Sequence, residues 1–80
     1  MELVVQVPDE IARAMRVPES ERKRRVELEL ACALYAQGVL SGGKAAPLAG
    51  MQRIRFGEEL AARNIARHYT EENLRQDLAE

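Results

Sequence analysis

The stretch that decides the fold runs SGGKAAPLAGMQRIRFGEEL, from Ser41 to Leu60. It predicts a short helix, a glycine turn and a second helix, which is the sequence form of a helix-turn-helix. Ser41 is a good N-cap, and Gly50 readily takes the left-handed backbone conformation that ends many helices. Small side chains before the turn allow close helix packing, and larger apolar side chains after it anchor the second helix: Ala45, Ala46 and Ala49, then Met51, Phe56 and Leu60.

Length and composition indicate one small domain over residues 1–80. A domain of this size buries only roughly 60–65% of the surface of its unfolded chain, so we expect support from a partner subunit. Cys32 is the single cysteine and His68 the single histidine, which excludes an intrachain disulfide and makes a zinc site implausible. Without a membrane span of roughly 20 apolar residues or a signal peptide, we expect a cytoplasmic protein with no membrane contact and no cofactor.

Residues 1–18 predict an arm made of a strand and a short helix. Leu3, Val5 and Val7 alternate with more polar positions, as in a half-buried strand. Pro8 ends this strand, and Asp9 is expected to cap the helix that follows. Because a lone strand cannot satisfy its own backbone hydrogen bonds, we expect it to pair with the same strand of a second copy in a homodimer.

Residues 19–65 predict a helical core that begins with a long helix over residues 19–38, capped by Ser20 and ended by Gly38. The long helix carries two apolar stripes, one formed by Val26, Leu30, Ala33 and Leu34 and the other by Leu28, Cys32, Tyr35 and Val39. A surface helix needs only one such stripe. The second stripe therefore indicates either packing on both sides or a side that binds a partner.

A basic cluster stands at the start of the long helix: Arg22, Lys23, Arg24 and Arg25. Positive charge at a helix N-terminus opposes the helix dipole, so it brings no stability there. Two interpretations stay open, a solvated face or a patch that contacts phosphate or an acidic partner.

Residues 66–80 predict an acidic C-terminal tail helix, with Thr70 as its N-cap and Glu71 and Glu72 in its first turn. Leu74 and Leu78 give it a thin apolar stripe. Such a helix is marginal alone, so it either docks on the body or on a partner, or it remains a solvated tail.

From Tyr35 onward the chain resembles a small prokaryotic family known as uncharacterised protein family 175. The resemblance rests on four sequence words: LYAQGVLS, GKAA, LAGM and RHYTEENL. It implies an antitoxin with a central helix-turn-helix and a nuclease-type toxin of the PIN fold as partner. The family usually has glutamate at the position of Pro47, a bulky residue at that of Gly57 and leucine at that of Glu59. These departures weaken the second helix as a reader of DNA.

The sharpest functional hypothesis is DNA binding by the second helix. Gln52 and Arg53 are candidates for base contacts, because they stand near the start of that helix. Lys44 and Arg55 are candidates for phosphate contacts. The second helix also carries apolar residues on two sides, which leaves packing or a protein interface as the alternative.

The expected toxin contacts lie in the acidic tail: Tyr69, Glu71, Glu72, Leu74 and Leu78. An enzyme is not expected, since His68 has no sequence sign of a nucleophile or a carboxylate relay beside it. Residues 41–44 lack the spacing of a phosphate-binding loop. The sequence thus predicts a mainly α fold with a helix-turn-helix core, acting as an antitoxin-like regulator. The alternative is a structural or protein-interaction dimer without DNA binding.

Overall fold

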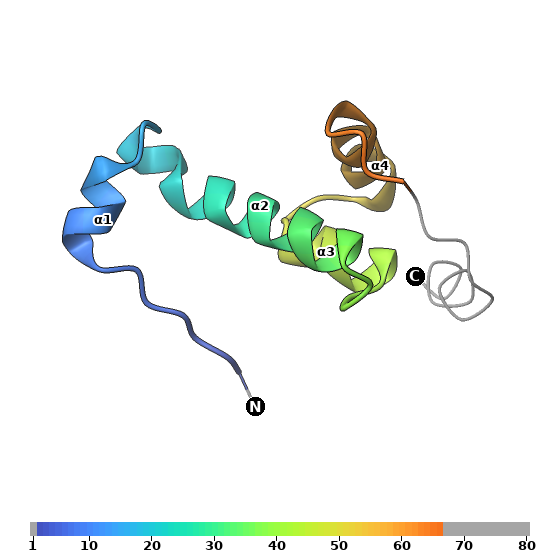
Figure 1. The fold of residues 1–80 in the computed structure, drawn as a ribbon, viewed down its shortest axis with the longest axis horizontal. Coiled ribbons are helices and arrows are strands. Elements are labelled where there is room, and N and C mark those ends of the chain that lie inside the picture. Colours follow the sequence, from blue (N-terminus) through green and yellow to red (C-terminus); the bar gives the residue numbers. More distant parts are fainter. Residues whose placement is uncertain (1, 67–80) are drawn as a thin grey trace.

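The computed structural model describes residues 2–66, and this part of the chain is mainly helical, as the sequence predicts (Figure 1). Its elements, in chain order, are α1 (Asp9–Ala14), the 3-10 helix η1 (Glu19–Glu21), α2 (Arg22–Ala36), α3 (Gly42–Leu48) and α4 (Arg53–Ala62). The acidic tail helix expected over residues 66–80 lies outside the described residues, apart from Ala66.

The long helix α2 is the centre of the arrangement. Helix α1 lies toward its N-terminal end, the arm runs back from α1 along α2, and α3 and α4 gather near its C-terminal end (Figure 1). Helix α3 packs against α2, and α4 packs against α3. The helix, glycine turn and helix expected over residues 41–60 are therefore present, and the first of these two helices packs on α2.

The core lies where α2, α3 and α4 meet. It consists of residues from α2, from α3 with its C-cap, and from α4: Leu28, Ala31, Cys32 and Tyr35, then Ala45, Ala46 and Ala49, and finally Phe56 and Leu60. Phe56 meets Tyr35 edge to face, with ring centroids 6.1 Å apart and ring planes at 87°. Burial raises the pKa of the Cys32 thiol, in line with the inert buried cysteine that its place on an apolar stripe indicates.

Helices α2, α3 and α4 end in the same way, with one residue in the left-handed conformation. These residues are Gly38 at φ 74°, Gly50 at φ 70° and Asn64 at φ 57°. Each end carries two reversed hydrogen bonds, and in α3 these are Gly50 N to Pro47 O at 2.9 Å and Met51 N to Ala46 O at 2.9 Å. This is the Schellman motif, which satisfies the last carbonyls of a helix. Gly38 and Gly50 were correctly predicted as the turn residues.

The N-terminal ends of the helices differ from the sequence prediction. Glu21 takes the place of the N-cap expected at Ser20, because residues Glu19–Glu21 form a 3-10 turn before α2. Pro8, whose carbonyl accepts the first bonds of α1, takes the place expected for Asp9. Pro8 has φ −54° and ψ 143°, and no side chain forms a capping hydrogen bond at the start of α1.

Residues 2–8 run as an extended arm beside α2, and no strand is assigned within the described residues (Figure 1). In this part of the chain, residues 2–7 make no backbone hydrogen bond. A strand exists only when its backbone groups pair with another strand, and residues 2–66 of one chain offer the arm none. The apolar alternation of the arm is present without the pairing that we expected.

The contact between α2 and α3 depends on alanine. Ala45 is completely buried in α3, so replacing it with leucine would force extra methyl groups between the two helices. We expect Ala45→Leu to lower the free energy of unfolding by about 1–3 kcal/mol. Ala33→Leu is the matched control, because Ala33 is an exposed alanine within α2. Urea unfolding followed by circular dichroism compares the two, and equal stability of both variants would contradict the packing described here.

Candidate nucleic-acid interface

The burial of two side chains sets the orientation of α4. Phe56 and Leu60, one helical turn apart, are each 2% exposed and point into the core. The opposite side of α4 is therefore turned to solvent, and Ile54 on that side is 82% exposed. Of the two apolar sides that the sequence gives this helix, only one is buried within the described residues.

A surface hollow of 730 Å³ lies between the start of α4 and the first half of α2. Gln52 and Arg55 line it from the α4 side, and Arg24 and Glu27 line it from α2, with the turn residues Ala49, Gly50 and Met51. The structure thus brings two of the predicted DNA-binding residues together with one residue of the basic cluster. Glu27 places one negative charge in the same hollow.

The remaining candidates for DNA contact lie around this hollow. Arg53 is the first residue of α4, directly after the N-cap Gln52, and it is partly buried. Lys44 is exposed on α3. Neither side chain lines the hollow, so it contains two of the four predicted contacts.

The basic cluster faces several directions, because consecutive residues of a helix point about 100° apart. Arg22 and Lys23 line an apolar groove beside the N-terminal arm. Arg24 faces the hollow at the start of α4. Arg25 forms an ion pair with Glu29, with 3.5 Å from Nε to Oε2. Only Arg24 therefore adds its charge to the candidate interface.

A network of ion pairs joins α4 to α2. Arg63, at the C-cap of α4, donates from Nη1 to Oε1 of Glu59 at 2.7 Å and from Nη2 to Oε2 of Glu29 at 3.1 Å. The hydrogen bonds from Arg63 lower the pKa of both carboxyls, and the two carboxylates together raise the pKa of Arg63. Glu59, which we expected to weaken the second helix, thus has a structural role.

Arg55 lies at the exposed end of this network. Its guanidinium is 3.7 Å from Oε1 of Glu58 and 3.5 Å from Oε2 of Glu59, and its side chain is 61% exposed. Exposed pairs of this kind are worth roughly 0–1 kcal/mol. Arg55 can therefore exchange these carboxylates for a phosphate at little cost.

The link between Glu29 and Arg63 and the position of Arg24 over the turn are features that the sequence reasoning missed. Glu29 and Arg63 are 34 residues apart, and no local pattern signals that they meet. The ion pair between Arg25 and Glu29 could be predicted from the sequence, since residues four apart on a helix are neighbours. The predicted toxin contacts Tyr69, Glu71, Glu72, Leu74 and Leu78 lie outside the described residues.

Residues 2–66 contain no group of three or more His, Cys, Asp or Glu side chains arranged to hold a metal ion. No helix among these residues has the length and apolar content needed to cross a membrane.

Fold and site together define a small, mainly helical protein whose last two described helices are joined by a glycine turn. The chain belongs to the uncharacterised protein family UPF0175, whose sequence model matches residues 1–80. It is 41% identical over 76 residues to a UPF0175 protein of Aeropyrum pernix, a match that covers 95% of this chain and 81% of that relative. No solved structure matches the chain. The family resemblance read from the sequence words is confirmed.

The network around Arg63 makes stability depend on pH. Because Arg63 lowers the folded-state pKa of Glu29 and Glu59 below the ordinary value of 4.5, their contribution is present above that value and is lost as pH falls below it. We expect Arg63→Met to lower the thermal midpoint at neutral pH and to weaken its fall below pH 4.5. Arg24→Met, in an exposed arginine of α2, is the control that should keep the parent's pH dependence. Identical pH profiles for the parent and Arg63→Met would contradict this assignment.

Proposed function

We propose that this protein is an antitoxin-like regulator that binds DNA through the start of α4 and binds a nuclease-type toxin. The observation that carries the DNA part is the hollow in which Arg24, Gln52 and Arg55 meet beside the turn. A helix that starts at such a turn, with Gln52 and Arg55 exposed at its beginning, suits insertion into the major groove of DNA.

Each residue of the interface has a chemical task in this proposal. Gln52 and Arg53 contact base edges, since an amide can pair with adenine and a guanidinium with guanine. Lys44, Arg24 and Arg55 contact phosphates and so fix the position of the protein on the duplex. The exposed ion pairs of Arg55 cost little to break. The carboxylate of Glu27 in the same hollow repels the phosphates of DNA and so limits how deeply a phosphate can enter.

The toxin part rests on the family resemblance and on the chemistry of the C-terminal residues. The family implies a partner of the PIN nuclease type. A nuclease that binds nucleic-acid phosphate presents a basic surface, and the segment from Tyr69 to Leu78 offers Glu71 and Glu72 as carboxylates and Leu74 as an apolar contact. A cytoplasmic homodimer, joined by its N-terminal strands, is the form in which we propose that the protein acts.

A second candidate function is a protein-interaction dimer that does not bind DNA. The observation in its favour is Ile54, a large apolar side chain that is 82% exposed on the same helix as the proposed DNA contacts. Apolar side chains on a surface suit a protein partner better than a phosphate backbone. DNA binding and its salt dependence separate the two candidates.

The DNA part is tested by gel retardation with the DNA upstream of the gene. We expect binding that weakens as salt rises, and a loss of about 1–3 kcal/mol for Arg53→Ala if that arginine contacts a base. Arg13→Ala is the control, because Arg13 lies on α1 in an ion pair with Asp9. The absence of retardation at low salt would reject DNA binding and favour the interaction module.

The toxin part is tested by co-expression with the neighbouring gene and sizing of the complex. We expect a stable complex with a nuclease-like product, and its loss when residues 67–80 are removed. Replacing Glu71 and Glu72 together with glutamine should weaken the complex without removing the apolar contacts of Leu74 and Leu78. An adjacent gene that encodes no nuclease, together with no captured toxin, would reject this part of the proposal.

A further inference from the structure

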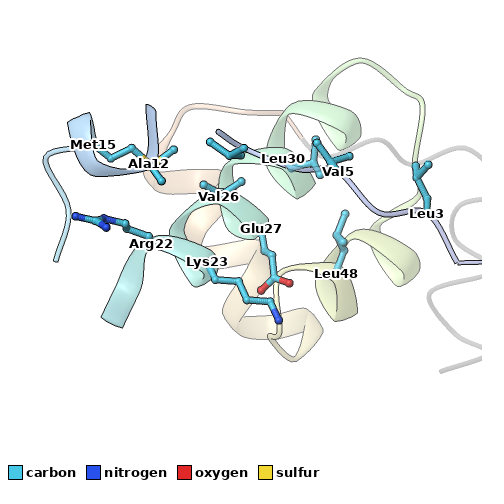
Figure 2. Close-up of a pocket in the computed structure, with 11 residues that line it drawn as sticks. Leu3, Val5, Ala12, Met15, Arg22, Lys23, Val26, Glu27, Leu30 and Leu48 are labelled. Carbon is cyan, nitrogen blue, oxygen red and sulfur yellow. The ribbon is translucent and has the colours of Figure 1, made fainter. Parts of the chain in front are cut away.

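The apolar stripe of α2 that the core does not use lies between two surface hollows. Its side chains Val26 and Leu30 line both of them. One is the groove of 380 Å³ beside the N-terminal arm, where the arm forms part of the wall (Figure 2). The other is a more open hollow of 550 Å³, and none of residues 2–8 lines it.

This second hollow, the α1–α2 hollow, has both apolar and charged walls. They come from the end of α1 with the turn that follows it, and from one face of α2: Met15, Arg16 and Val17, then Arg25, Val26, Glu29 and Leu30. Four of these side chains are apolar, and Leu30 is 43% exposed. Apolar side chains that gather on a surface mark a site of contact.

The charges around the α1–α2 hollow favour an acidic occupant. Glu29 is already engaged, because it accepts a hydrogen bond from Nη2 of Arg63 at 3.1 Å and lies 3.5 Å from Nε of Arg25. Arg16 is exposed, and no carboxylate of residues 2–66 pairs with it. A segment that brings carboxylates beside apolar side chains therefore complements this surface.

The C-terminal segment of the same chain, which lies outside the described residues, has this combination. Residues 70–80 carry four carboxylates and one arginine, and their apolar side chains include Leu74 and Leu78. The two leucines are four positions apart, so the helix that the sequence predicts there holds them on one side.

The positions of the carboxylates on that helix differ. At about 100° per residue, Glu71 and Asp77 flank the stripe of Leu74 and Leu78, one on each side. Glu72 falls on the far side of the helix. Glu71 and Asp77 are therefore the carboxylates that can meet arginines at the edge of a hollow that the leucines cover.

The place where the described chain ends brings this segment to the α1–α2 hollow. The bond from Arg63 to Glu29 ties the end of α4 to a side chain that lines the hollow, and Ala66 is only three residues further on. A linker of residues 67–69 adds up to roughly 10 Å, and a helix over residues 70–80 is roughly 16 Å long. The segment therefore has the length to lie along the hollow.

We propose that residues 70–80 dock as a helix in the α1–α2 hollow of their own chain. Leu74 and Leu78 cover the apolar side chains of the hollow. Glu71 and Asp77 lie toward its arginines. The second apolar stripe of α2 is then covered on one side by the arm and on the other by the C-terminal helix.

Docking has a consequence for the toxin part, and this consequence alone rests on the proposed function. Leu74 and Leu78 are proposed toxin contacts, so a toxin must first displace them from the α1–α2 hollow. The docking itself requires neither toxin nor DNA. A failure of toxin capture therefore leaves the docking intact, and a failure of docking leaves toxin capture as a separate measurement.

Hydrogen–deuterium exchange of the full chain, followed by mass spectrometry, tests the docking. We expect the amides of residues 71–80 to exchange at least about 10-fold faster in Val17→Asp than in the parent, because the new charge desolvates poorly and repels the carboxylates. Val7→Asp is the matched control and should keep the exchange of the parent. Val17 lines the α1–α2 hollow alone, whereas Val7 lines the groove beside the arm alone.

A second pair of variants tests the orientation of the docked helix. We expect Glu71→Gln to speed the exchange of residues 71–80 by about 2–5-fold, the effect of losing one exposed ion pair. Glu72→Gln should leave it unchanged. The two glutamates are neighbours in the same first turn, so a general effect of charge on the helix would appear in both variants. Equal effects of the two overturn the orientation proposed here.

Dilution separates the chain's own segment from that of a second copy. We expect the exchange of residues 71–80 to be the same at roughly 100 µM and roughly 1 µM, because docking within one chain does not depend on concentration. Protection that is lost on dilution would assign the hollow to a second copy and overturn the proposal. Exchange in the parent as fast as in Val17→Asp, or faster exchange in Val7→Asp instead, would also overturn it.

Discussion

The close approach of α3 to α2 is the constraint on which the rest of the structure depends. Ala31, Ala45 and Ala46 are almost completely buried, and side chains this small let the two backbones lie near each other. That contact fixes the position of the turn at Gly50. The turn then directs α4 so that Phe56 and Leu60 lie in the same core. The position of the start of α4, with Arg53 and Arg55, therefore depends on alanines that lie in the core and not in the candidate interface.

Most of the helical part of the fold could be predicted from the sequence, because its signals are local. Gly38 and Gly50 mark helix ends through their own backbone freedom, and the small and large apolar residues on either side of Gly50 indicate the packing. The predictions of N-caps at Ser20 and Asp9 were wrong, because Glu21 holds that position in α2 and Pro8 holds it in α1. The strand could not be decided from one chain, since its existence depends on a partner for its backbone.

The candidate site was predictable only in part, for a similar reason. Gln52 and Arg55 were found because they follow the turn in sequence, whereas Arg24 joins them only through the packing of α2 beside the turn. The four consecutive residues 22–25 form one basic cluster in the sequence, but on the helix they point in different directions. Arg22 and Lys23 line the groove beside the arm, Arg24 lines the hollow, and Arg25 pairs with Glu29. Glu59, which we expected to weaken the second helix, forms the closest ion pair of Arg63.

The repeated Schellman ends have a consequence for how the chain folds. Each of the three turns forms from residues within one or two helical turns of one another, and each helix packs on its neighbour in sequence. Proteins with such local topology fold in roughly microseconds to milliseconds. The bond between Glu29 and Arg63 spans 34 residues and closes late by the same reasoning. A chain of this design completes its helices almost at once and joins α4 to α2 through Arg63 afterwards.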